Sequence, residues 1–189
     1  MRRAYPVTAA MLLATAAVAS SPPEWTGQAR SAAASLGAAL MPELNRALTD
    51  DGPITAVEVC NVRAPQIAAG ITRPGLEIGR TALRVRNPAN APDAWERQTL
   101  EHFTTRLADG ADPASLEAWT TATVDGRKVG RWMKAIPTAP LCITCHGENI
   151  APELARTIER LYPDDQATGF EVGQLRGAFT ATVDLSGHD

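Results

Sequence analysis

Two cysteines and a histidine lie together in the run Cys142-Ile143-Thr144-Cys145-His146. Two thiols at this spacing can each form a thioether bond with one vinyl group of a haem. The histidine directly after the second cysteine can then ligate the iron from the proximal side. This short run predicts one covalently attached haem c, with Cys142 and Cys145 as its anchors and His146 as an iron ligand.

Two other kinds of site use paired cysteines, and the sequence favours neither of them. A thioredoxin-like redox pair lies at the start of a helix that follows a strand, and it gains nothing from a histidine after the second cysteine. A structural zinc site needs a fourth ligand, which usually comes from a second paired motif, and the chain contains no second pair. Haem attachment is the interpretation that uses all three residues.

The third cysteine, Cys60, has no disulfide partner in this chain once the other two hold haem. Val57, Ala64 and Ile67 recur with it at steps of three and four residues, which places Cys60 on the inner face of an expected helix. A buried free cysteine is often an inert core residue. A cysteine thiolate can also ligate haem iron opposite a histidine, so both interpretations stay open on the residues alone.

Other side chains compete for the sixth iron position, and each has a simpler explanation. His102 falls on the helix face opposite the apolar stripe, and His188 lies beside the end of the chain. Met41 and Met133 stand in apolar patterns, where methionine usually serves packing. Lys134 is more typical of a surface charge. An empty sixth position is the remaining alternative, and it favours a gas-binding or peroxidase-like role.

Arginine recurs at every second or fourth position in the segment that follows the first two expected helices. Arg80, Arg84 and Arg86 fall on one face of a strand expected over residues 78–86. Such a row is usually a solvated face. A guanidinium group also matches the geometry of a carboxylate, so Arg80, Arg84 and the later Arg176 are candidates for contacts with the haem propionates.

The elements that must position these residues form a mixed pattern. Helices are expected over residues 24–48, 54–71, 92–108 and 151–162, and strands over residues 78–86, 115–136 and 178–184. The middle strand region should be a hairpin that turns at Asp125-Gly126. Pro42 and Pro65 should kink or interrupt their helices. Since strands and helices do not alternate, the pattern predicts an α+β domain, an antiparallel sheet flanked by helices with a helical N-terminal segment.

The first 19 residues have the features of a secretory signal. Arg2 and Arg3 precede a short apolar run that ends in Ala17-Val18-Ala19, a small-residue cleavage site. The run is too short to span a bilayer. We expect residues 1–19 to be a signal peptide, with an uncleaved anchor as the alternative. Residues 20–189 should then form a single periplasmic domain with no membrane contact after cleavage.

The charge of the chain argues against nucleic acid and anionic lipid as partners. The formal net charge is −3, and loss of the two signal arginines would take it two units lower, to −5. Haem propionates would add more negative charge. A surface of this sign repels phosphate backbones and anionic headgroups.

Four sequence blocks together resemble a known family. They are Glu58-Val59-Cys60 with Ala64-Pro65 and Ile67-Ala68, then residues 80–90, residues 142–147, and residues 162–179. The combination resembles a family of exported single-haem c-type proteins with a PAS-like sensor fold, long classed as a domain of unknown function. The resemblance covers residues 54–183 or so. It implies a haem ligated by the histidine of the attachment motif, here His146, and by a distal cysteine, here Cys60.

The function expected from these observations is that of a redox or small-ligand sensor module, with a gas or a redox partner protein as its counterpart. A soluble electron-transfer monohaem cytochrome c is the alternative. A peroxidase-like enzyme would need an acid-base residue beside an open iron position, and His102 is the only internal candidate. We therefore expect no enzymatic activity.

Overall fold

The computed structural model of the chain describes residues 21–187. In this range four strands form one antiparallel sheet in the order β1-β4-β3-β2, with helices before and between them in the chain. The elements are α1 (Thr26–Arg46), α2 (Gly52–Ile71), β1 (Leu76–Thr81), α3 (Ala94–Ala108), β2 (Glu117–Val124), β3 (Arg127–Pro137), α4 (Ile143–His146), α5 (Pro152–Leu161) and β4 (Leu175–Asp184). The predicted α+β class with a PAS-like antiparallel sheet is confirmed. The predicted signal peptide at residues 1–19 lies outside the described residues.

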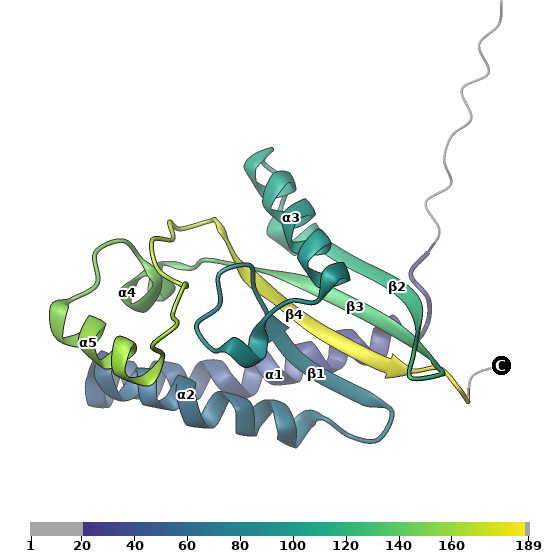
Figure 1. Cartoon of the computed structure of the whole chain (residues 1–189), viewed down its shortest axis with the longest axis horizontal. Helices are drawn as coiled ribbons and strands as arrows, with labels where there is room; N and C mark the ends of the chain where they lie inside the picture. The colour runs from purple at the N-terminus through teal and green to yellow at the C-terminus, as the bar shows by residue number, and fades with distance from the viewer. Residues whose placement is uncertain (1–20, 188–189) are drawn as a thin grey trace, which may run out of the picture.

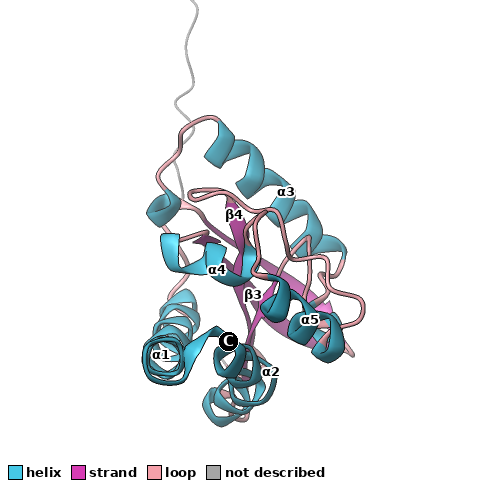
Figure 2. Ribbon diagram, turned by 90° about the vertical axis from the view of Figure 1, so that its left-hand side faces the viewer, coloured by secondary structure: helices cyan, strands magenta, loops and turns pink. Residues whose placement is uncertain are grey.

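Helices cover both faces of the sheet. The pair α1 and α2 packs on one face, and α3 packs on the other (Figures 1 and 2). The core under α1 includes buried Leu36, Leu76, Trp132 and Val183, with Ala29, Ala32 and Ala33 on the helix. The core under α3 includes Leu100, Phe103, Leu116, Met133 and Ala135. The sheet thus forms the central layer of the molecule.

The two N-terminal helices follow each other with little interruption. A π-helical turn over residues 47–51 joins them, and Gly52 then takes a φ of +83°. Pro42 and Pro65 both lie inside their helices, and neither one ends its helix. No helix in the described range is long and apolar enough to cross a membrane.

The predicted hairpin is present, with its turn at the predicted residues. β2 and β3 pair in antiparallel register from Glu117 opposite Lys134 to Val124 opposite Arg127. Asp125 and Gly126 have φ values of +49° and +76°. Two consecutive residues with positive φ make the tight turn that matches the twist of the flanking strands.

The first strand is shorter than the sequence pattern predicted. β1 ends at Thr81, and residues 82–87 leave the sheet rather than continuing to residue 86. The segment pairs instead with the loop before β4, where the Gln166 amide donates to the Val85 carbonyl at 2.8 Å. β4 in turn begins at Leu175, earlier than the expected residue 178. The alternating pattern of residues 82–86 therefore does not correspond to a strand, because the chain bends away from the sheet after Thr81.

One end of the molecule has a small apolar cluster of its own. Val57 of α2 packs there with Leu154 and Ile158 of α5 and with Tyr162, and Cys145 lies against this cluster. Helices α4 and α5 sit at this end, beside α2 (Figures 1 and 2). The end cluster, as we call these four buried residues, brings the cysteine-histidine motif next to the helix that carries Cys60.

Candidate functional site

The motif Cys142–His146 folds into a very tight turn. Pro140 begins a short 3-10 helix that ends at Cys142, and the single-turn helix α4 follows. The Gly147 amide closes the turn by donating to the Ile143 carbonyl at 2.9 Å. A Cβ on Gly147 would come 2.5 Å from that oxygen, so only glycine fits there. Both motif cysteines and Cys60 are free thiols.

His146 presents one ring nitrogen for metal binding. Its Nδ1 lies 2.7 Å from the Ala167 carbonyl oxygen. A carbonyl oxygen only accepts, so Nδ1 carries the proton and Nε2 keeps its lone pair. Burial, and after it the positive charges of Arg176 and Arg86, lower the pKa of His146 to about 2. The ring is therefore neutral at physiological pH, which is the form that ligates a metal.

Cys60 faces the same interior as the motif. It is half-buried on α2, on the helix face that also carries buried Val57 and Ala64, as the sequence predicted. Burial raises the pKa of Cys60, Arg80 and Arg86 act to lower it, and Cys142 acts to raise it. The pKa of Cys145 is also raised, first by burial and in part by Cys60. Cys145 also packs beside Val57, one turn of α2 from Cys60, so these thiols lie in one region between α2 and the attachment motif, which we call the pocket.

Two arginines add uncompensated positive charge to this pocket. Burial lowers the pKa of Arg80 on β1, and burial together with Arg86 and Arg80 lowers the pKa of Arg176 to about 10. Neither guanidinium forms an ion pair with any residue in the 21–187 range. Buried cations normally have an anionic partner. The pocket therefore has the charge that would suit a bound carboxylate.

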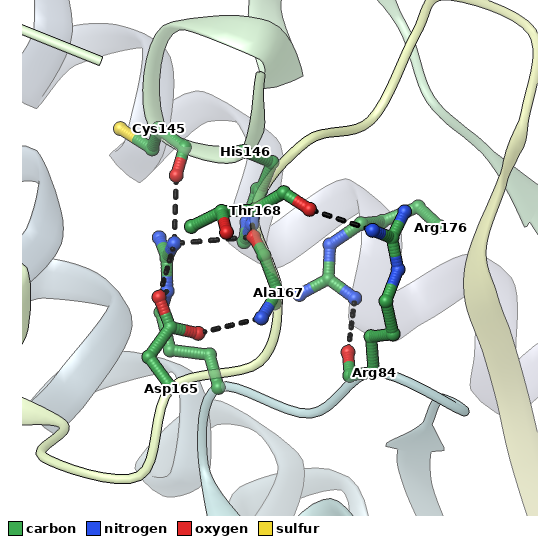
Figure 3. Close-up of polar contacts among 8 residues, drawn as sticks. Arg84, Cys145, His146, Asp165, Ala167, Thr168 and Arg176 are labelled. Carbon is green, nitrogen blue, oxygen red and sulfur yellow. Dashed lines mark hydrogen bonds and ion pairs between the residues drawn. The ribbon is translucent and has the colours of Figure 1, made fainter. Parts of the chain in front are cut away.

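Arg84 and Arg86 do not share a solvated strand face, and that expectation was wrong. Arg84 is exposed and donates to the Thr168 carbonyl at 2.7 Å (Figure 3). Its guanidinium carbon also lies 3.7 Å from the ring centroid of Phe170. Arg86 is only 8% exposed and pairs with Asp165 at 2.9 Å. The two side chains diverge because the chain has already left the sheet after Thr81.

Phe170 links this arginine group to His146. Arg176 lies on the same ring as Arg84, 5.3 Å from its centroid. The edge of Phe170 meets the His146 ring at a centroid distance of 6.3 Å and an angle of 88°. Two surface hollows of about 740 and 320 Å³ also reach Phe170, but neither is lined by Cys60 or His146. Neither hollow therefore contains the candidate iron ligands.

The other side chains considered as iron ligands lie elsewhere. Met133 is fully buried in the core under α3, whereas Met41 is 43% exposed. His102 is exposed on α3, and Lys134 donates to the Ala114 carbonyl. His188 lies outside the described residues. Within residues 21–187 no three side chains of His, Cys, Asp or Glu are grouped as a ready-made metal site.

Three further residues at the site were not predicted from the sequence. Asp165 and Ala167 contact Arg86 and His146, and Tyr162 lies buried near Cys60 and Arg80. The only sequence signal for Asp165 was its place as a second acidic residue directly after Pro163-Asp164. Ala167 acts through its backbone, so its residue type carries no signal.

Comparisons with known proteins agree on one relationship. A sequence model of the Tll0287-like family matches residues 8–184. A solved structure described as "Crystal structure of the cyanobacterial heme-protein Tll0287" aligns with a TM-score of 0.61 and 25% sequence identity. The alignment covers 87% of this chain and 97% of the other. No curated protein matches the sequence.

Proposed function

Because this chain belongs to the Tll0287-like family, we propose that it binds haem, as the description of its structural relative states for Tll0287. We further propose one haem c, attached through Cys142 and Cys145, with His146 as the proximal ligand and Cys60 as the distal one. The observation that supports this proposal is the packing of the attachment motif against α2. Cys145 lies against Val57, one turn from Cys60, and the hydrogen bond to the Ala167 carbonyl leaves Nε2 of His146 available to a metal.

The chemistry of the pocket fits a haem better than a metal ion alone. A haem brings four nitrogen ligands of its own and needs the protein only at the two axial positions, so the absence of a ready-made ligand cluster in the described residues is no obstacle. A haem also carries two carboxylates. Arg80 and Arg176 are the best candidates for them, because both are half-buried without an ion-pair partner among residues 21–187. Arg84 is a weaker candidate, since it already contacts Thr168 and Phe170.

A sensor role follows from the distal cysteine. When bound, a haem supplies a one-electron redox change and an axial position for a small ligand such as a gas. With haem bound, Cys60 as a thiolate would favour the ferric state. Reduction would weaken the hold on this anionic side chain, and a proton from solvent would convert Cys60 to a neutral thiol that is free to move. Helix α2 packs against α1, α5 and β1, so a shift of Cys60 reaches the rest of the domain.

Electron transfer is the alternative role, and it needs a ligand set that does not change on reduction. A distal cysteine that leaves the iron would slow reversible transfer, which favours the sensor. We propose a non-enzymatic role, supported by the exposed position of His102 away from the pocket. Export to the periplasm as a single domain of residues 20–189 is proposed on the signal pattern of the first 19 residues.

The deciding experiment is the mass of the protein produced in a host that attaches haem to exported chains. The expected mass is that of the processed polypeptide plus one haem, stable to acid and organic solvent. The double substitution Cys142→Ala with Cys145→Ala should lose that added mass. Cys60→Ser is the matched control and should keep it. A bare polypeptide in all cases would contradict the proposal.

The distal ligand is tested on the same material by optical and EPR spectroscopy of the ferric protein. Thiolate ligation predicts a low-spin signal that changes character in Cys60→Ser. Val62→Ala, an exposed position on the same helix, should leave the signal unchanged. Identical spectra for the wild type and Cys60→Ser would assign the distal position to another group.

A further inference from the structure

A buried ion pair lies directly behind the cysteine-histidine motif. Arg86 and Asp165 are 8% and 9% exposed, and Asp165 Oδ2 accepts from both Nε and one terminal nitrogen of Arg86, at 3.1 and 2.9 Å. The same terminal nitrogen donates to the Cys145 carbonyl at 2.7 Å. Two opposite charges removed from water in this way hold a fixed geometry, because any shift would leave a buried charge unpaired. The pair therefore fixes the backbone of the attachment turn.

The pair also fixes the residue that orients His146. Asp165 Oδ1 accepts from the Ala167 amide at 2.8 Å, and Arg86 donates to the Ala167 carbonyl at 3.3 Å. That carbonyl is the acceptor for Nδ1 of His146 at 2.7 Å (Figure 3). Arg86, Asp165 and Ala167 thus form a closed ring of hydrogen bonds. Both the amide and the carbonyl of Ala167 are hydrogen-bonded within this ring.

We propose that Arg86 and Asp165 are positioning residues for His146, acting through the Ala167 carbonyl. The inference rests on the proposed role of His146 as the proximal haem ligand. A hydrogen bond from the second ring nitrogen sets the plane of a ligating imidazole and increases its donor strength. Because Ala167 has no side chain that could hold it, the angle of its carbonyl depends on the ion pair. The donor strength of His146 therefore depends on two residues that never touch the iron.

A purely structural role is the competing explanation, since a buried ion pair always affects stability. The two roles differ in what they predict for His146. A structural role changes only the free energy of unfolding. If the pair has a positioning role, disturbing it also weakens the hydrogen bond from Nδ1–H of His146 to the Ala167 carbonyl, and this speeds exchange of the Nδ1 proton. The same disturbance also lowers the donor strength of the imidazole, and this raises the midpoint potential because ferric iron loses stabilisation.

The test uses two variants of the full haem-loaded chain that keep every charge, Arg86→Lys and Asp165→Glu. The first removes the fork geometry of the guanidinium, and the second moves the carboxylate by one methylene. Both should raise the midpoint potential. Both should also speed exchange of the Nδ1 proton of His146 with deuterium, followed by NMR, by about fivefold, the ratio that corresponds to loss of one hydrogen bond. Either variant suffices if the other one does not fold.

Arg30→Lys is the matched control. Arg30 also forms a forked pair, with Glu117 of β2 at 2.7 Å. It should lose some stability and leave both the potential and the exchange rate unchanged. Arg86→Lys and Asp165→Glu proteins that carry haem and behave like Arg30→Lys would overturn the positioning role while leaving haem binding intact. A wild-type chain with no haem mass would overturn the proposed function, and this inference with it.

Discussion

Gly177 of β4 lies directly against the main-chain carbonyl of Thr81, the last residue of β1. A Cβ on Gly177 would come 2.5 Å from that oxygen and 3.1 Å from the Cβ of Ala82. The two strands can approach this closely only because Gly177 has no side chain. The contact also determines where the pocket arginines lie, since Arg80 precedes Thr81 and Arg176 precedes Gly177 in the chain.

Gly177→Ala should therefore destabilise the protein. The atom in the way belongs to the backbone and cannot rotate aside, so we expect a loss of about 2 kcal/mol in the free energy of unfolding, as for other overpacked sites. Chemical denaturation of the haem-loaded chain measures it. Gly79→Ala in β1 is the control, because its Cβ would meet only Thr180 Cγ2 at 3.9 Å. Equal losses for both variants would contradict the steric argument.

Loss of a pocket arginine should lower the midpoint potential of the haem-loaded protein. Arg80→Gln and Arg176→Gln each remove a buried positive charge that acts on Cys60, and positive charge near the iron favours the ferrous state. Redox titration measures the change, and mass spectrometry checks that haem is retained. Arg73→Gln is an exposed control and should leave the potential unchanged. Potentials that match this control would remove both arginines from the surroundings of the cofactor.

Carbon monoxide tests the proposed departure of Cys60. When the ferric wild-type protein is mixed with reductant and CO together, CO binding should be limited by the departure of Cys60 that follows reduction. Cys60→Ala should bind CO faster under the same mixing, because it has no thiolate to lose. Stopped-flow mixing gives both rates, with Val62→Ala on the same helix as control. A reduced wild-type spectrum that CO does not change would count against the sensor and favour electron transfer.

The N-terminal cap of α3 should make stability depend on pH. Asp93 accepts a hydrogen bond from the Glu96 amide at 2.9 Å and pairs with Arg131 at 2.6 Å. Burial alone would raise the pKa of Asp93, but these partners outweigh it and hold the pKa below the ordinary 3.8. The folded state therefore prefers the ionised form. Its contribution is complete above pH 3.8 and is lost as the pH falls from there through the lower folded value.

Asp93→Ala should accordingly lose about 1 kcal/mol at pH 7, the usual value of such a cap. The deficit relative to wild type should shrink below pH 3.8. Denaturation midpoints of both proteins at pH 7 and pH 3 measure this. Asp93→Asn keeps a capping oxygen without a titrating group, so its deficit should be smaller at pH 7. A deficit for Asp93→Ala that is the same at both pH values would contradict the assignment.

The sequence predicted those parts of the fold whose signals are local. The hairpin turn at Asp125-Gly126 and the helical stripe of Leu100 and Phe103 depend on neighbours in the chain, and both are present. The end of β1 depends instead on contacts with residues 165–177, far along the chain. No pattern within residues 78–86 could reveal these contacts, so the arginine row was interpreted as a strand face.

The same distinction applies to the site. Cys142, Cys145 and His146 were predicted as attachment and ligand residues because thioether chemistry fixes their spacing, and these roles stay predictions. Cys60 was placed on the correct helix face by periodicity, while its role as ligand remains a prediction. Asp165 and Ala167 were missed because one acts through an ion pair and the other through a backbone carbonyl.

The mutual repulsion of Arg80 and Arg176 has a consequence for maturation of the protein. Each guanidinium makes it harder to bury the other as long as no anion separates them. In a chain that has not yet received haem, this repulsion would therefore destabilise the end of the domain that carries both arginines. The two carboxylates of a bound haem would remove the repulsion and stabilise that end. Chains without haem would unfold locally at this end more often, and a protease that cleaves locally unfolded segments would degrade them in preference to the haem-loaded protein.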